Sequence, residues 1–214
     1  LPDCVQAYWR FEDCTPERTV LPSIDIIDSS GKDNHLRGAD FKYDGSGSAD
    51  VPASTIPATG RVNLCSYDNS EAPKDGAEAR YLSTADSPIN RLKARSWAIE
   101  ASILPKDTTR AQTFLGRENG ELQFGLTADG RVEIRCKGAS ATSKKPLTAG
   151  KWYNLAAMCD GSSLRLYIDS MDGKGYVLDS SAKLADYTPG EGKWTVGCAL
   201  RDGKPADQFF GLID

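Results

Sequence analysis

Apolar and polar residues alternate along the segment 120–170, on both sides of two Asp-Gly pairs. A period of two is typical of half-buried antiparallel strands. Asp129-Gly130 and Asp160-Gly161 interrupt the alternation, and Asp-Gly pairs tolerate the positive φ angles that hairpin turns require. We therefore predict two β-hairpins. In the first hairpin, the residues expected to face the core are Leu122, Phe124, Leu126, Val132, Ile134 and Cys136.

The second hairpin leaves one alternative open. In its first strand, either Leu155 and Ala157 face the core, or Trp152, Ala156 and Met158 do. The strand after the turn carries one apolar face only. Its inward residues are expected to be Leu164, Leu166 and Ile168.

Short strand-like segments continue through the rest of the chain. Turn residues recur at intervals of about 8–12 residues, the spacing of β-sandwiches. Before residue 180, only residues 88–93 suggest a helical turn. We predict an all-β, two-sheet antiparallel β-sandwich of about twelve strands with minimal helix. Further strands are expected at residues 5–12, 24–27, 36–41, 79–83, 96–104, 112–116, 176–178, 194–200 and 209–214.

The length of 214 residues predicts a single domain, because β-sandwiches of this size form one core. Glycine and proline concentrate in the segment 42–77, which we interpret as an irregular insertion. The chain begins with Leu1-Pro2-Asp3 and stops within a strand-like segment. We expect a module of a longer chain, with its closing strand cut at Asp214.

Composition argues against nucleic acid and membrane insertion. The formal net charge is −4, and no basic run exceeds Lys144-Lys145. No apolar stretch approaches the roughly 20 residues that span a bilayer. Nucleic acid and an anionic membrane are therefore disfavoured as partners, and the module is expected to be monomeric.

Six cysteines without a CxxC pair favour disulfides over buried free thiols. This predicts a secreted, periplasmic or cell-surface protein. If residues 5–12 form a strand, Cys4 and Cys14 lie about 30 Å apart, too far for a bridge. If residues 131–136 pair with 152–159, a Cys136–Cys159 bridge is also disfavoured. Other pairings stay open.

Four segments carry a family resemblance. They are Tyr8-Trp9-Arg10-Phe11-Glu12, the turn DSSGKDNHLRG at 28–38, the hairpin from Gly150-Lys151-Trp152-Tyr153 to Leu166-Tyr167-Ile168-Asp169, and Phe210-Gly211-Leu212-Ile213-Asp214. Together they resemble the laminin-G-like, concanavalin A-like lectin and glucanase jelly-roll family of extracellular multidomain proteins. Ser170 replaces the usual glycine, and the segment 42–77 is longer than the family link. The resemblance implies a jelly roll and does not specify a ligand.

The turn at 28–34 concentrates oxygen ligands suited to Ca²⁺. The alternative is an Asx turn whose side chains cap their own backbone. The resemblance implies a structural calcium ion near the first and last strands. The candidate metal ligands are Glu12, Asp28, Asp33 and Asp214.

A catalytic constellation is not recognisable. Glucanases of this broad fold align three carboxylates on one strand face, whereas Asp25 and Asp28 would point to opposite faces. Glu118 and Glu121 flank a hairpin turn and suggest a solvated rim. His35 is the only histidine, and a turn position explains it better than a catalytic base. We expect a protein that is not an enzyme.

Aromatic side chains could form a platform for sugar rings. The four tryptophans lie on alternating strands and are assigned to the core. The tyrosines are better candidates for exposed contacts, above all in the insertion. The candidate ligand-binding residues are Tyr67, Asp68, Asn69 and Tyr153.

The sequence thus predicts a non-catalytic extracellular binding module, most consistent with a lectin-like carbohydrate-binding role. The alternative is a protein-interaction or spacer module, which would expose an apolar patch. A polysaccharide hydrolase or lyase is the third hypothesis, and it requires a carboxylate pair or a Tyr–Arg cluster in a groove.

Overall fold

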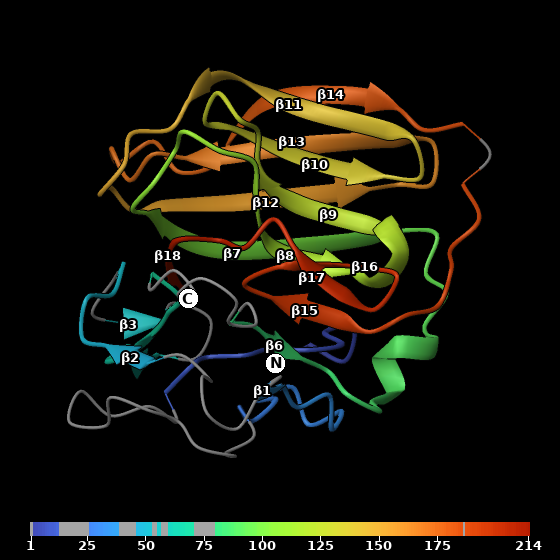
Figure 1. Ribbon diagram of the computed structural model, residues 1–214, viewed down its shortest axis with the longest axis horizontal. Coiled ribbons are helices and arrows are strands. Elements are labelled where there is room, and N and C mark those ends of the chain that lie inside the picture. The colour runs from blue at the N-terminus through green and yellow to red at the C-terminus, as the bar shows by residue number, and fades with distance from the viewer. Residues whose placement is uncertain are drawn as a thin grey trace.

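A computed structural model shows two seven-stranded antiparallel sheets packed face to face (Figure 1). The structure describes residues 2–12, 26–38, 46–52, 55–56, 60–70, 80–185 and 187–214. In spatial order, the first sheet contains β1 (Arg37–Gly38), β6 (Leu82–Ser83), β15 (Trp194–Val196), β8 (Gln112–Arg117), β9 (Leu122–Leu126), β10 (Arg131–Cys136) and β11 (Ala139–Pro146).

The second sheet includes the last strand of the chain near its centre. In spatial order it contains β14 (Val177–Lys183), β13 (Ser163–Asp169), β12 (Tyr153–Cys159), β7 (Trp97–Pro105), β18 (Gly211–Ile213), β5 (Ser66–Asp68) and β2 (Ser46–Ser48). Two small ribbons pair β16 (Ala199–Arg201) with β17 (Lys204–Ala206), and β3 (Thr55–Ile56) with β4 (Arg61–Val62). The 3₁₀ turns are η1 (Pro88–Arg91) and η2 (Glu118–Gly120).

The predicted hairpins are confirmed. Strands β9 and β10 pair around Asp129-Gly130, and β12 and β13 pair around Asp160-Gly161. Gly130 and Gly161 have φ angles of 77° and 89°, the left-handed region that hairpin turns use. The open alternative is resolved, because Leu155 and Ala157 are fully buried.

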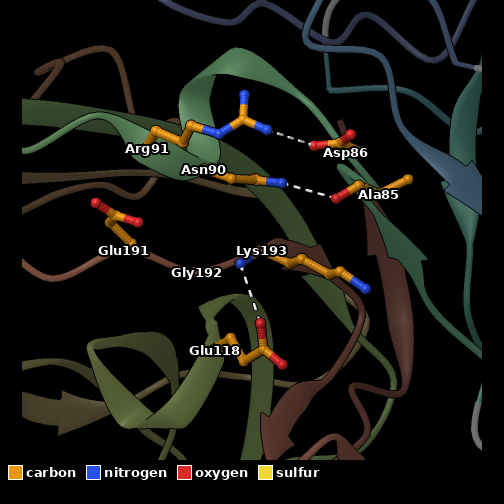
Figure 2. Close-up of a pocket in the computed structure, with 8 residues that line it drawn as sticks. All are labelled: Ala85, Asp86, Asn90, Arg91, Glu118, Glu191, Gly192 and Lys193. Atoms are coloured by element: carbon orange, nitrogen blue, oxygen red, sulfur yellow. Dashed lines mark hydrogen bonds and ion pairs between the residues drawn. The ribbon is translucent and has the colours of Figure 1, made fainter.

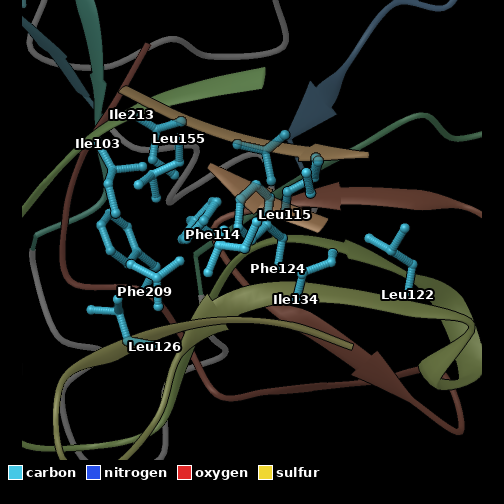
Figure 3. Close-up of a cluster of buried hydrophobic side chains, with 14 of the residues drawn as sticks. Ile103, Phe114, Leu115, Leu122, Phe124, Leu126, Ile134, Leu155, Phe209 and Ile213 are labelled. Carbon is cyan, nitrogen blue, oxygen red and sulfur yellow. The ribbon is translucent and has the colours of Figure 1, made fainter. Parts of the chain in front are cut away.

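The core lies between the two sheets (Figure 3). Phe114 and Phe124 from the first sheet contact each other with ring centroids 4.6 Å apart. Ile103, Leu155 and Ile213 of the second sheet contribute to the same cluster. Every residue predicted to face inward from β9 and β10 is buried, as the alternation required.

Several predicted boundaries are wrong. Residues 5–12 form no strand, and Trp9 makes only an isolated bridge to Asp28. Strand β11 was missed because its sequence, ASATSKKP, is polar and lacks an apolar alternation. As an edge strand, β11 pairs on one side only, with β10. The structure describes eighteen strands, many of two or three residues, where about twelve were expected.

The cysteine geometry also differs from the expectation. Strands β10 and β12 belong to different sheets, so the assumed hairpin between them is wrong. Cys4, Cys136, Cys159 and Cys198 are free thiols, whereas Cys65 is disulfide-bonded. Cys14 and Asp25 lie outside the described residues. Burial raises the pKa of the Cys136 thiol to about 11, which makes it unreactive at neutral pH.

Part of the insertion at 42–77 is integrated into the sandwich. Strand β5 pairs with β18, and β2 pairs with β5, so both extend the second sheet. The remaining residues of the insertion lie partly outside the described ranges. Among the described residues, no helix is both long and apolar enough to cross a membrane.

Candidate ligand-binding site

Three neighbouring strands of the second sheet carry a row of hydrogen-bonded polar side chains on their outer face. Asn154 of β12 lies opposite Ser102 of β7 on one side and Asp169 of β13 on the other. The Ser102 hydroxyl donates to Asn154 Oδ1 at 2.8 Å, and Asn154 Nδ2 donates to Asp169 Oδ2 at 3.2 Å. The backbone N–H of Met171 donates to Asp169 Oδ1 at 2.7 Å. We call Ser102, Asn154 and Asp169 the polar row.

The outer face beside the polar row holds aromatic and small side chains. In the adjacent register, Ala156 lies between Glu100 and Tyr167. Tyr176, just before β14, is 44% exposed. Burial raises the pKa of its phenol, and the charges of Glu100 and Asp169 raise it further. The charges of both carboxylates therefore act on the Tyr176 hydroxyl.

Asp214 extends the row toward the first residues of the chain. Asp214 and Ser102 exchange two backbone hydrogen bonds, of 2.8 and 2.9 Å. The Asp214 carboxylate accepts a hydrogen bond from the Asn63 amide. Burial, helped by the Glu12 charge, raises the pKa of Asp214 to about 6, although the Asn63 hydrogen bond and the Arg10 charge oppose the shift. Glu12 and Asp214, far apart in sequence, thus share one environment.

The donor atoms around Asp214 fit a hard cation. Asn63 is 5% exposed, and its Oδ1 is buried without a hydrogen-bond partner. Glu12 Oε1 accepts from the backbone N–H groups of Leu64 and Cys65 at 2.9 and 3.3 Å. Two carboxylates and one unpaired amide oxygen are ligands that Ca²⁺ accepts, with waters or carbonyls completing six to eight oxygens. Within the described ranges, no group of three or more His, Cys, Asp or Glu side chains gathers as a metal site.

The other two predicted metal ligands remain in their own turn. The Asp28 carboxylate is buried and accepts from Tyr8 N, Ser30 N, Ser30 Oγ and Asn34 N at 2.7–3.1 Å. Burial opposes its ionisation, but these hydrogen bonds together lower its pKa. Asp33 is exposed beside His35. Asp28 therefore matches the alternative of an Asx turn, because its own turn uses the carboxylate. Asp33 lies apart from it at the surface, so these two residues do not form a metal site together.

The expected exposure of the ligand-binding tyrosines is wrong. Tyr67 lies opposite Ile213, so its ring faces the core and is 1% exposed. Asn69 is fully buried and donates to the carbonyls of Gly197 and Phe209, both at 3.0 Å. Tyr153 is buried, and its hydroxyl accepts from Thr148 N at 3.0 Å. The structure does not bring these side chains together on a surface.

Asp68 points outward but is engaged locally. It lies 3.6 Å from the Lys106 ammonium and accepts from Ser70 N at 2.9 Å. The outer-face residues that the sequence analysis missed are the polar positions of confirmed strands. The sequence signal for them is the set of residues between the apolar ones, which must face outward on the same strands. These are positions 100, 102, 154, 167 and 169.

A second feature is an open pocket of about 610 Å³ at one end of the sandwich (Figure 2). It is formed by η1, η2 and the segment before β15. Its charged side chains include Asp86, Arg91, Glu118, Glu191 and Lys193. Asp86 pairs with Arg91 at 3.0 Å, and Glu191 pairs with Lys93 at 2.8 Å. The hydrogen bond and charge of Lys93 lower the pKa of Glu191, so this carboxyl stays ionised at neutral pH.

Solved structures similar to this one share the fold at low sequence identity. Domain 4 of AbnA, a GH43 extracellular arabinanase from Geobacillus stearothermophilus solved with arabinotriose, is 16% identical with a TM-score of 0.54; the match covers 92% of this chain and 89% of that one. A mutant GH54 α-L-arabinofuranosidase is 12% identical with a TM-score of 0.54, over 88% and 46%. A SAP-like pentraxin from Limulus polyphemus is 9% identical with a TM-score of 0.51, over 68% and 71%. This chain thus spans less than half of the arabinofuranosidase chain.

Sequence comparison identifies the family, whereas the structural matches show only the fold. No curated protein sequence matches it. A family model described as the concanavalin A-like lectin/glucanases superfamily, of the laminin G type, matches residues 75–214. That range contains both hairpins, the polar row and the closing strand β18. Since the match covers well over half of its length, the chain belongs to the concanavalin A-like lectin/glucanases superfamily.

Proposed function

We propose that this chain is a non-catalytic carbohydrate-binding module of an extracellular protein, and that its ligand lies on the polar row. One observation carries the proposal. Ser102, Asn154 and Asp169 form a hydrogen-bonded chain across three strands, beside the partly exposed tyrosines Tyr167 and Tyr176. Sugars present hydroxyl groups next to apolar CH faces, and this surface offers partners of both kinds.

Preorganisation favours binding at this face. The row side chains stand on paired strands, and each orients its neighbour through a hydrogen bond. A ligand therefore loses little affinity to ordering the protein. The arabinotriose-bound domain with the same fold makes arabino-oligosaccharides the first probe.

Binding without cleavage is supported by the state of the row carboxylate. Both oxygens of Asp169 already accept hydrogen bonds, from Asn154 and Met171. A glycosidase needs one carboxyl as an acid and a second as nucleophile or base, across the bond to be cleaved. Asp169 is held as a structural acceptor, which suits recognition of hydroxyl groups better than nucleophilic attack.

A protein-interaction role is the second candidate. Val177 and Leu178 on the edge strand β14 are 53% and 49% exposed. Exposed apolar residues at an unpaired strand edge can bind another chain. The two functions differ in which residues matter, because Tyr176 and Asn154 would serve a sugar whereas Val177 and Leu178 would serve a protein.

The test is calorimetric titration of neutral oligosaccharides, starting with arabinotriose, into the chain and three variants. Tyr176→Ala and Asn154→Ala are expected to weaken binding roughly tenfold, or about 1.4 kcal/mol. Val177→Ala is the matched control and is expected to bind like the unchanged chain. If no neutral glycan binds, or if all three variants bind equally, the proposed site is wrong.

The proposal includes a structural calcium ion held by Glu12, Asn63 and Asp214. When bound, the ion would neutralise the paired carboxylates and satisfy the Asn63 amide oxygen. Arg10 partly fulfils that electrostatic role already, so we expect stabilisation rather than a requirement for folding. Melting would be compared in calcium and in chelator, with Asp214→Asn as the test and Asp33→Asn as the control. A calcium shift that survives Asp214→Asn would refute this site.

A further inference from the structure

One tryptophan lies outside the core. Among the described residues, Trp9, Trp97 and Trp194 pack against the cluster between the two sheets, whereas Trp152 is not part of it. The assignment of all four tryptophans to the core is therefore wrong for Trp152. This residue directly precedes β12 and is partly exposed. Its position and its contacts decide what an indole at the surface can do.

Trp152 points to the same face of the second sheet as the polar row. Tyr153 is buried and Asn154 belongs to the row, so the alternation of side chains places Trp152 on the side of Asn154. The backbone N–H of Gly150 donates to the Pro105 carbonyl at 2.7 Å, so the chain still runs beside β7 at this point. Trp152 is therefore the next outward position along the chain from the polar row.

The insertion at 42–77 holds the indole in place. Trp152 Nε1 donates to Asp50 Oδ1 at 2.8 Å. The Asp50 carbonyl accepts from the Ser66 hydroxyl at 2.7 Å, and the Asp50 backbone N–H donates to Ser48 Oγ at 3.2 Å. Ser66 is fully buried on β5, which joins the second sheet through β18. A segment 102 positions away in the sequence thus orients the Trp152 side chain.

The bond to Asp50 uses the one polar atom of the indole and leaves the ring itself for apolar contact. Sugar rings stack their CH faces on aromatic rings of this kind. Because the indole is already held, a ligand loses little affinity to ordering it. An indole that only fastened the insertion to the sheet would not respond to a ligand, and this difference is the basis of the test.

A second aromatic side chain lies on the other side of the polar row. Tyr167 pairs with Ala156, and it points outward because Leu166 before it is fully buried. Positions 152 and 156 lie about 13 Å apart in an extended chain, and the polar row crosses between them at Asn154. This spacing exceeds one sugar ring. A ligand that contacts both aromatic residues must therefore contain several sugar units.

We propose that Trp152 is a platform for a sugar ring at one end of the polar row, and that the site takes a linear neutral oligosaccharide of at least three units lying along β12. One unit stacks on Trp152, the polar row binds the hydroxyl groups of the middle unit, and Tyr167 contacts the third. Asp50 is a positioning residue that acts through the indole. This inference rests on the proposed function and adds the length and direction of the ligand.

The experiment is calorimetric titration of arabinose, arabinobiose and arabinotriose into the chain and its variants. Affinity is expected to rise with each added unit. Trp152→Leu is expected to lower arabinotriose affinity about tenfold and to remove its advantage over arabinobiose, whereas Trp152→Phe should retain most of the affinity. Lys151→Ala is the matched control, because Lys151 is exposed and its ammonium lies over the Tyr153 ring instead.

Two further measurements separate stacking from a loss of folding. Asp50→Ala removes the acceptor of the indole and is expected to weaken arabinotriose binding about threefold, whereas Asp50→Asn keeps an acceptor oxygen and should bind like the unchanged chain. Arabinotriose should also shift the tryptophan fluorescence emission. Trp152→Phe should abolish this shift, because the other three tryptophans pack against the core.

The outcomes distinguish this inference from the proposed function. If arabinotriose binds and Asn154→Ala weakens its binding but Trp152→Leu does not, the function stands and the platform is refuted. Equal affinities for arabinose and arabinotriose would also refute the inference, and so would a fluorescence shift that survives Trp152→Phe. If no neutral glycan binds, the proposed function fails and this inference fails with it.

Discussion

The polar row and the end pocket show two ways in which this fold positions polar groups. In the row, three consecutive strands of a sheet set the spacing, and the backbone ladder holds each side chain in place. In the pocket, 3₁₀ turns and loops meet, and the three carbonyl bonds of Arg117 hold them together. The row should therefore tolerate the loss of one side chain, whereas the pocket depends on one buried residue.

The largest expected effect comes from Arg117→Met. Removing the guanidinium takes a donor from the carbonyls of Asn90, Leu92 and Gly192. Among the described residues, only the Asn90 carbonyl keeps another donor, the Gly192 N–H, so the loss should cost about 3 kcal/mol of unfolding free energy. Denaturant titration measures that loss. Calorimetry at a temperature where the variant is folded should show arabinotriose binding retained. Loss of arabinotriose binding would show that the two regions are not independent.

The pH dependence of the unfolding free energy should distinguish the end of the polar row from the pocket. Asp214 has a folded-state pKa of about 6, above the value of about 3.9 in an unfolded chain. The folded state therefore binds more protons between these values, so the unfolding free energy in chelator falls as pH rises from about 4 to 6, by about 1–3 kcal/mol. Asp214→Asn should flatten this slope.

Glu191 in the pocket should behave in the opposite way. Lys93 lowers its pKa, so its contribution to stability is present above the unfolded-state value and is lost as pH falls below it. Glu191→Gln should leave the slope between about pH 5 and pH 6 unchanged. A slope that persists in Asp214→Asn would contradict the assignment to Asp214.

Asn154→Ala should have a smaller effect on stability. It removes the hydrogen bonds to Ser102 and Asp169 on a partly solvated face, for a loss of about 1 kcal/mol. Met158→Ala, on the same strand and face, is the control, since Met158 is 40% exposed and makes no hydrogen bond of this kind. Thermal unfolding of both variants measures the difference. If Asn154→Ala lowered the unfolding free energy as much as Arg117→Met does, the distinction between row and pocket would be refuted.

The smallest expected effect is that of Asp86→Asn. The Asp86–Arg91 pair is largely exposed, with side chains 89% and 68% accessible, so the pair is worth under about 1 kcal/mol. We expect no measurable change in melting temperature. A loss of unfolding free energy well above about 1 kcal/mol would show that this exposed pair contributes more than solvent screening allows.

Much of the fold could be predicted because the alternation of apolar residues is a local property. Leu122, Phe124 and Leu126 face the core as their spacing required. Strand β11 could not be found in this way, since it is polar and its edge position is a consequence of pairing with β10. The register between strands likewise decided that Tyr67 packs against Phe11 in the interior, with ring centroids 6.0 Å apart, rather than on the surface.

The candidate sites were less predictable, for a physical reason. The sequence by itself determined the fold class, the two Asp-Gly hairpins and the faces of their strands, because turn chemistry and period-two patterning act within about ten residues. Only the tertiary structure decided which polar residues meet. Glu12 and Asp214 are two hundred and two positions apart, and Asn90, Arg117 and Gly192 come from three separate segments. Their proximity depends on strand order and sheet packing, which local patterning does not encode.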